Sequence, residues 1–423
     1  MRFSKTVLPN GLRLVTVPMP DNPSVTVLVM VEAGSKYETK ETNGISHFLE
    51  HMVFKGTPQR PKASDISREL DGIGAQYNAF TSQEYTGYYA KADARHFGRV
   101  LDVVADMYQH PLFDAAEIEK EKGVIIEELR MYRDLPQRHV HDILSSLLHG
   151  DQPAGWDVIG TEETIRSFGR DSFLRYRSEH YVASATTVIV AGSFDEQTIG
   201  ERVAAAFSGI PTGPKQPKLA VRESQSAPAI LIERKETDQT HLAIAFRAFP
   251  VLDPRVPVMQ VLSSALGAGM SSRLFTKMRD ELGICYYIRA SYDAFTDHGD
   301  LTISAGVDNG RVDVALTGIL AECARLTADL MPPAELQKVK DYLAGTTMLE
   351  LETSDARAEY AGGEEVLKGR IETPDELIAR VNAVTAAEVQ ALARQIFTDE
   401  GLNLALIGRA EEKALKPLVR LPE

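Results

Sequence analysis

The sequence predicts an α+β fold made of two duplicated domains, each with helices packed on a mostly antiparallel sheet. The 423-residue chain is longer than one hydrophobic core usually supports, so two domains are the default expectation. Near the middle, residues 211–228 (PTGPKQPKLAVRESQSAP) are rich in proline and polar residues and have no helical period, which is typical of a linker. These observations predict domains at residues 1–212 and 228–423, joined by a linker at 213–227.

A repeated apolar pattern indicates the duplication. Residues 165–192 and 381–408 align without a gap, and their apolar positions coincide although few residues are identical. Both segments predict a short helix, a second helix, a turn and a buried strand that ends in glycine, at Gly192 and Gly408. A chance coincidence of two α/β units is the alternative.

The remaining elements alternate between strands and helices without a strict β-α-β rhythm, which favours α+β domains. The first half predicts strands at 11–18 and 24–32, a hairpin at 75–80 and 84–91, and helices at 95–110 and 114–134. The second half predicts strands at 229–234, 240–247, 285–293 and 300–306, and helices at 254–266, 271–281, 309–326 and 332–350. The apolar run VTVLVMV at 25–31 suits a buried strand and is far too short to cross a bilayer.

Composition and charge exclude several classes of protein. The net charge of −14 argues against nucleic-acid binding, which requires a basic surface, and leaves open a solvated acidic surface or a preference for basic partners. Cys285 and Cys323 have no paired spacing, so a disulfide framework is excluded. The first residues, MRFSKTVLPNGLRLVTV, contain no apolar signal core. We therefore expect a cytoplasmic protein with no membrane association.

The clearest functional signal is the stretch GISHFLEHMVFKGT, residues 44–57, which contains His47, Glu50 and His51. On a helix the three polar residues lie within about 100° of one another, opposite an apolar stripe about 80° wide formed by Ile45, Phe48, Leu49 and Met52. Two imidazoles one turn apart have the spacing needed to bind one zinc ion at about 2.0–2.1 Å. Glu50 lies beside the metal, where it can take a proton from bound water. An amphipathic helix with two histidines by accident is the alternative.

The ends of this helix are also predicted. Asn43 or Thr42 is expected to cap its start, and Gly56 with Pro58 is expected to end it.

A zinc hydrolase needs a third protein ligand and an open position for water, and the helix at 117–132 (EIEKEKGVIIEELRMY) offers that ligand. Glu121 and Glu128 lie two turns apart along one edge of its apolar face, about 60–80° from Ile118. Glu127 points to the opposite side and is expected to face water. We therefore expect Glu128 to reach the metal, whereas solvated carboxylates on an exposed helix are the alternative.

These residues resemble a known family. The inverted order H-x-x-E-H at 47–51, together with the spacing from His51 to Glu128, is similar to that of the insulinase/pitrilysin family of zinc peptidases. The length and the stretch HFLEHMVFKGT resemble the branch of mitochondrial processing peptidase and its small bacterial relatives. The resemblance extends over nearly the whole chain, through LPNGLRLV, AQYNAFTSQEYTGYY, EKEKGVIIEEL, GMSSRLF and RDELGICYYI.

The resemblance implies a role for each matching residue. His47, His51 and Glu128 would bind Zn²⁺, and Glu50 would be the general base. Glu121 would match the family's second acidic residue, which orients a histidine ligand. Asn78 would hydrogen-bond substrate backbone, and the strand around Ala79 would be the edge on which a peptide adds as an extra strand. For Asn78, a hairpin residue that bonds its own turn is the alternative.

The implied function is a zinc-dependent endopeptidase that hydrolyses short or unfolded peptides in an enclosed chamber. Each chain would form half of a clamshell, closed by a second copy in a homodimer or by a metal-free homologue in a heterodimer. A catalytically silent structural subunit and a zinc-dependent binding module without hydrolysis are the alternatives. The second half has no H-x-x-E-H. In its place stands the glycine-containing stretch VLSSALGAGMSSRLF at 261–275, which fits either a chamber lining or a helix break.

Overall fold

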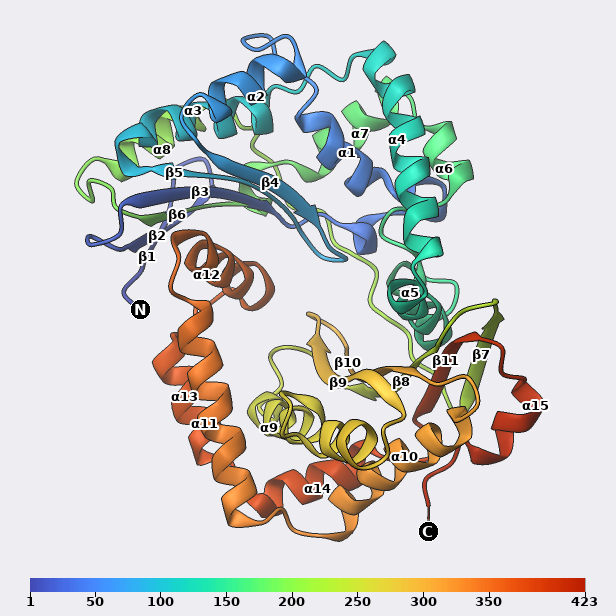
Figure 1. Cartoon of the computed structure of the whole chain (residues 1–423). Coiled ribbons are helices and arrows are strands. Elements are labelled where there is room, and N and C mark those ends of the chain that lie inside the picture. The colour runs from blue at the N-terminus through green and yellow to red at the C-terminus, as the bar shows by residue number, and fades with distance from the viewer. Residues whose placement is uncertain (423) are drawn as a thin grey trace. The chain divides into compact units, whose positions relative to one another are not determined.

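The structure is a computed structural model that describes residues 1–422. The chain forms two compact units, each built on one mixed sheet (Figure 1). The first unit comprises residues 1–130, 156–219 and 348–372, and the rest of the described chain forms the second. Each sheet carries packed helices, so the predicted α+β class is confirmed.

The first unit contains a six-stranded sheet with the strand order β1-β2-β6-β3-β5-β4. Its strands are β1 Ser4–Val7, β2 Arg13–Pro18, β3 Ser24–Val31, β4 Gln76–Thr81, β5 Thr86–Asp93 and β6 Thr186–Gly192. β2 and β6 are parallel, and all other neighbouring pairs are antiparallel. β4 is an edge strand, so one side of its backbone is not paired within the sheet.

The second unit contains a five-stranded sheet with the order β7-β11-β8-β10-β9. Its strands are β7 Ala229–Arg234, β8 Thr240–Ala248, β9 Cys285–Ala294, β10 Gly299–Val307 and β11 Leu402–Gly408. Only β7 and β11 run parallel among its neighbouring strands.

The two sheets share one topology, which confirms the predicted duplication. β6 and β11 start and stop at equivalent positions of the two aligned segments, and so do helices α7 and α14. β6 pairs in parallel with β2 and antiparallel with β3, and β11 makes the same two kinds of pairing with β7 and β8. β1 is an addition that only the first sheet has.

Helices cover both faces of each sheet. α3 lies on one face of the first sheet and α12 on the other (Figure 1). In the second unit, α9 and α14 pack on the face that carries Leu242, Ile244 and Phe246, while α5 packs on the opposite face at Ala243 and Ala245. The helices are α1 Ile45–Val53, α2 Ala63–Asp71, α3 Phe97–Gln109, α4 Ala115–Asp134, α5 Pro136–His149, α6 Glu162–Ser167, α7 Arg170–His180, α8 Ile199–Ala206, α9 Val256–Gly267, α10 Val312–Ala328, α11 Pro333–Glu350, α12 Ser354–Lys368, α13 Pro374–Ala383, α14 Ala386–Ile396 and α15 Glu412–Leu415.

Most of these elements coincide with the sequence predictions, with two kinds of difference. The segment predicted as a helix at 271–281 forms π-helical turns over Phe275–Glu281. Strand β1 and helices α2, α5, α8, α12 and α15 were not delineated from the sequence. None of the helices within residues 1–422 is both long and apolar enough to cross a membrane.

Each unit includes a helix that comes from the other half of the sequence. α5 belongs to the second unit and α12 to the first, so the units are discontinuous, whereas the predicted division at 213–227 follows the chain. The small residues Ala358, Ala361 and Gly362 let α12 approach its sheet closely. A Cβ at Gly362 would overlap Met30 Sδ and lie 3.1 Å from Ile189 Cδ1. Backbone approach at Gly362 therefore fixes the helix on the sheet.

This close approach predicts opposite effects at two adjacent glycines of α12. Gly362→Leu should destabilise the first unit by about 1–3 kcal/mol, because the added side chain overpacks the contact with Met30. Gly363→Ala is the matched control, since its Cβ meets nothing within 4 Å, and it should stabilise the helix by up to about 1 kcal/mol. Thermal unfolding of both variants measures the effects, and equal shifts would contradict the packing argument.

Candidate active site

The histidine pair lies on α1, whose start is fixed by a buried carboxylate. Glu38 accepts hydrogen bonds from the backbone N–H groups of Gly44 and Ser46, both at 2.8 Å, and from the Asn43 side-chain amide at 3.1 Å. Gly44, the N-cap residue, has φ 94°, and no side chain caps the helix from that position. The prediction that Asn43 or Thr42 caps the helix is therefore wrong, because a negative charge from upstream in the chain takes that place. Burial raises the pKa of Glu38, while the hydrogen bonds act in the opposite direction.

Packing of the apolar stripe sets the rotation of α1. Ile45, Phe48, Leu49 and Met52 are buried as predicted. The Phe48 ring meets that of Phe173 edge to face at 4.9 Å. This orientation leaves the opposite side of the helix, with His47, Glu50 and His51, for polar contacts.

The third acidic group comes from α4. Glu121 is buried and Glu128 is one-fifth exposed, whereas Glu127 is exposed and pairs with Arg130 at 2.8 Å. These positions agree with the predicted faces of the helix. Glu128 Oε2 lies 3.7 Å from His47 Nε2 and 3.4 Å from His51 Nε2.

The donor set of this cluster fits a zinc ion. One ligand atom from each of His47, His51 and Glu128 lies within 4.8 Å of the other two. Two ligands on one tetrahedral zinc, at about 2.0–2.2 Å each, stand about 3.3–3.6 Å apart, close to the observed separations. Two imidazoles and one carboxylate are also a ligand set of zinc hydrolases, which keep a fourth position for water.

Glu121 holds the second histidine in place. Its Oε1 lies 2.9 Å from His51 Nδ1, and its Oε2 lies 2.5 Å from Lys55 Nζ. A proton on His51 Nδ1 that bonds to the carboxylate leaves Nε2 directed toward Glu128. Burial raises the pKa of Glu121, but the bonds from His51 and Lys55 outweigh it and lower the pKa overall.

Glu50 has a partner that sequence reasoning missed. The Thr81 hydroxyl, at the end of β4, donates a hydrogen bond of 2.5 Å to Glu50 Oε2. Burial raises the pKa of Glu50, and the bond from Thr81 acts in the opposite direction. The alternation of side chains along a strand could have indicated this contact. In a strand, Thr81 faces the same side as Ala79 and the opposite side from Asn78. Lys55, four residues after His51 in the turn that follows α1, was also missed.

Asn78 and Ala79 lie on β4, the edge strand of the first sheet. Ala79 is 9% exposed and Asn78 is exposed. Since side chains alternate along a strand, Asn78 projects from the face opposite to Thr81 and Glu50. Asn78 therefore lies on the side of β4 away from Glu50, and Thr81 is the residue of this strand that contacts Glu50.

The second unit lacks this arrangement. Its helix α9 carries no histidine, and it ends where a Cβ at Gly267 would clash with the backbone N of Ala290 in β9. Gly267 thus allows the helix to end against the sheet, which gives the glycine-containing stretch a packing role.

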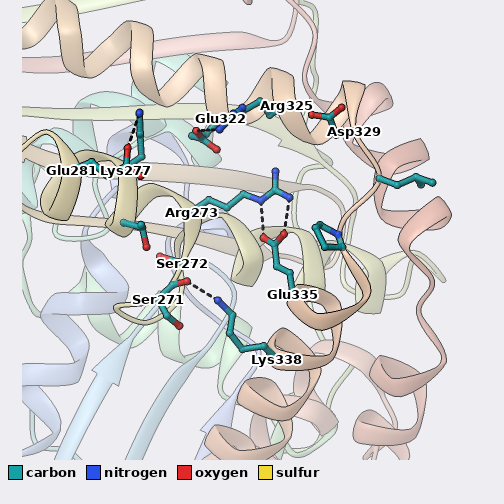
Figure 2. A pocket seen from close by; sticks show the side chains of 13 residues that line it. Ser271, Ser272, Arg273, Lys277, Glu281, Glu322, Arg325, Asp329, Glu335 and Lys338 are labelled. Carbon is teal, nitrogen blue, oxygen red and sulfur yellow. Dashed lines mark hydrogen bonds and ion pairs between the residues drawn. The ribbon is translucent and has the colours of Figure 1, made fainter.

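A polar cavity of about 440 Å³ lies in the second unit (Figure 2). Arg273 makes two hydrogen bonds to Glu335, at 2.7 and 2.8 Å, and Lys277 pairs with Glu281 at 2.7 Å. Histidine is absent from the described residues that line the cavity, and these cations are already neutralised. This cavity therefore lacks the pair of imidazoles that the α1–α4 cluster offers to a metal ion.

Comparison with known proteins decides the family. Residues 13–162 match the family described as Insulinase (Peptidase family M16), and residues 167–343 match the Peptidase M16 inactive domain. The uncharacterized zinc protease YmxG of Bacillus subtilis is 39% identical over 402 residues, which are 94% of this chain and 96% of that protein. This chain belongs to the insulinase family, M16. The resemblance read from the motifs is confirmed.

Two further proteins are similar to nearly the whole chain. An uncharacterized zinc protease of Streptomyces coelicolor is 33% identical over 415 residues, 97% of this chain and 90% of that protein. The crystal structure of a protease from Helicobacter pylori has a TM-score of 0.91 at 21% identity and covers 96% of this chain and 99% of that one. The match to the inactive domain agrees with the missing H-x-x-E-H of the second half.

The carboxylates around His51 favour its protonated ring, so we expect a proton on that ring to compete with a metal ion for the nitrogen. Burial lowers the pKa of His51, but bonds and charges from Glu121 and Glu128 outweigh it and raise the pKa from 6.5 to about 9. In the metal-free chain the charged ring therefore contributes stability below pH 6.5, and this contribution is lost as the pH rises through about 9.

We therefore expect zinc binding at pH 7.5 to release about one proton from His51. Calorimetry in buffers of different ionisation enthalpy measures this release. Glu121→Gln should lower the pKa of His51 and reduce the release. An unchanged release in Glu121→Gln would contradict the assigned contact.

Proposed function

We propose that this M16 protein is a zinc-dependent endopeptidase that hydrolyses short or unfolded peptides, with Glu50 as general base. The proposal rests on one observation, the convergence of His47, His51 and Glu128 within 4.8 Å beside Glu50 on the same helix as the histidines. The description of its relatives as zinc proteases supports the same chemistry.

Each residue of the site has its own role in the proposed hydrolysis. When bound, zinc lowers the pKa of a water ligand to about 7 and polarises the scissile carbonyl. Thr81 holds Glu50 Oε2, so Oε1 accepts the proton of the attacking water and then returns it to the leaving amine. Glu121 keeps the His51 ring oriented through Nδ1. The unpaired side of β4 offers backbone groups to an extended peptide, which supports strand addition near Ala79.

The proposal includes a chamber closed by two chains. A homodimer is the simplest closure, because one chain already contains a half with the histidine pair and a half without it. A heterodimer with a metal-free homologue is the rival. Light scattering on the purified chain should give twice the mass of 46.5 kDa, and a monomer that cleaves peptide would overturn this part of the proposal.

The general base is tested by Glu50→Gln. This variant should retain zinc but lose about 10²–10⁴-fold in kcat on an internally quenched peptide, because the amide cannot accept the water proton. Mass spectrometry of products from a peptide library, run on both proteins, identifies the cut sites. An active Glu50→Gln protein would refute the assignment.

The ligand set is tested by two adjacent glutamates of α4. Glu128→Gln should lose the zinc of this site on dialysis, whereas Glu127→Gln, with its exposed side chain, should keep it. His51→Ala should behave like Glu128→Gln. Elemental analysis per chain is the measurement, and equal zinc in the two glutamate variants would show that Glu128 is not a ligand.

Thr81 is a positioning residue, since it acts through Glu50. Thr81→Val removes the hydroxyl, so we expect a fall in kcat of about 10-fold, as for loss of one hydrogen bond to a charged group. The acid limb of the pH profile should move upward, because the bond from Thr81 lowers the pKa of Glu50. Thr81→Ser should restore both, and an unchanged profile in Thr81→Val would exclude this role.

A catalytically silent structural subunit is the alternative. A chain of complex III2 from Candida albicans has the same fold, with a TM-score of 0.86 at 18% identity. The presence of both histidines, Glu50 and Glu128 favours the enzyme, because a silent subunit has no need of a complete ligand set. Peptide cleavage that a chelator abolishes supports the enzyme, and no cleavage with zinc bound supports a binding module.

A further inference from the structure

A second group of metal-binding side chains lies wholly within the second unit. His149 is the last residue of α5, His298 lies in the turn between β9 and β10, and Asp300 is the second residue of β10. One ligand atom from each lies within 4.8 Å of the other two. The three residues are only 7%, 2% and 6% exposed, so the cluster is more deeply buried than the α1–α4 site.

The packing of α5 brings the cluster together from distant parts of the chain. Val140, Leu144 and Leu148 of α5 pack on Ala243 and Ala245 of β8. This contact places the end of the helix over the start of β10, which pairs with β8. His149 thereby meets Asp300, although the two lie far apart in the sequence.

The buried Asp300 carboxylate accepts few hydrogen bonds. Its Oδ2 lies 3.3 Å from His149 Nε2, and its Oδ1 has no hydrogen-bond partner among residues 1–422. Arg247 is its register partner on β8, but the guanidinium donates instead to the Leu148 carbonyl and the side chains of Gln225 and Glu223. A buried charge in this state is costly unless a cation compensates it.

The geometry of the two imidazoles also fits an ion. Their ring centroids lie 4.7 Å apart, compared with 4.8 Å for His47 and His51. His298 Nδ1 lies 3.0 Å from Asp297 Oδ1, a contact that orients the ring with Nε2 as the ligand atom. The separation of 3.3 Å between His149 Nε2 and Asp300 Oδ2 is close to the edge of a zinc tetrahedron, about 3.4 Å.

We propose that His149, His298 and Asp300 bind one divalent transition-metal ion of the zinc class. The ion ties the end of α5 to the β9–β10 hairpin and compensates the Asp300 carboxylate. Two imidazoles and a carboxylate favour zinc over magnesium or calcium, which prefer oxygen ligands. Burial of all three side chains makes the site structural rather than hydrolytic. This site is independent of the proposed peptidase function.

Zinc counting on the full-length chain tests the proposal. The metal-free protein is incubated with excess zinc, freed of unbound metal by gel filtration and analysed by mass spectrometry of the element. The wild type should hold about two zinc ions per chain and His51→Ala about one, since only the first site is removed. Adding His298→Gln to His51→Ala should remove the remaining ion. Adding His141→Gln, a histidine on the same helix as His149 but outside the cluster, should not.

Two further measurements keep the result decisive if His298→Gln fails to fold. Zinc should raise the Tm of folded His51→Ala, and X-ray absorption of its zinc should show nitrogen and oxygen ligands including two imidazoles. A folded His51→Ala chain without zinc and with an unchanged Tm would overturn the proposal. Retention of that zinc by the folded double variant with His298→Gln would overturn it too. Both outcomes are distinct from loss of peptidase activity, which depends on the first unit.

Discussion

The candidate active site depends on one contact, that of the Glu128 carboxylate with two imidazoles one helical turn apart. Holding a carboxylate and two imidazoles together, partly removed from water, costs free energy unless other groups compensate their charges. Two supports reduce the cost. Glu38 fixes the start of α1 with its own buried carboxylate, and Glu121 bonds His51 from the side away from Glu128. The start of the helix and the orientation of His51 are thus each held by a separate carboxylate.

Duplication of the fold did not duplicate the chemistry. Both sheets contain the same parallel pair, and β6 and β11 occupy equivalent positions in the two aligned segments. However, α1 places histidines and glutamate on its polar face, while α9 is apolar almost throughout and ends at Gly267 against β9. The same packing of sheet and helices is compatible with a helix that carries histidines, such as α1, or with one that does not, such as α9. The core requires only the apolar side of each helix.

The two histidine clusters show how burial changes what similar ligands do. His47 and His51 remain partly exposed, at 13% and 21% of their side chains, so water can reach the space between them. His149, at the end of α5, and His298, in the turn between β9 and β10, have side chains that are only 3% and 1% exposed. This difference supports the proposed hydrolytic role of the first cluster and the proposed structural role of the second.

The sequence by itself determined the fold class and the duplication, and it predicted the four residues of the candidate metal and general-base site. Those features depend on period and spacing along single helices and strands, which local sequence specifies. Only the tertiary structure decided that Thr81 holds Glu50, that Glu38 caps α1 and that Asp300 meets His149. It also decided that α5 and α12 join the sheet of the opposite half. These contacts depend on which surfaces pack together, often between residues far apart in the sequence. The apolar period of one segment does not show which other segment packs against it.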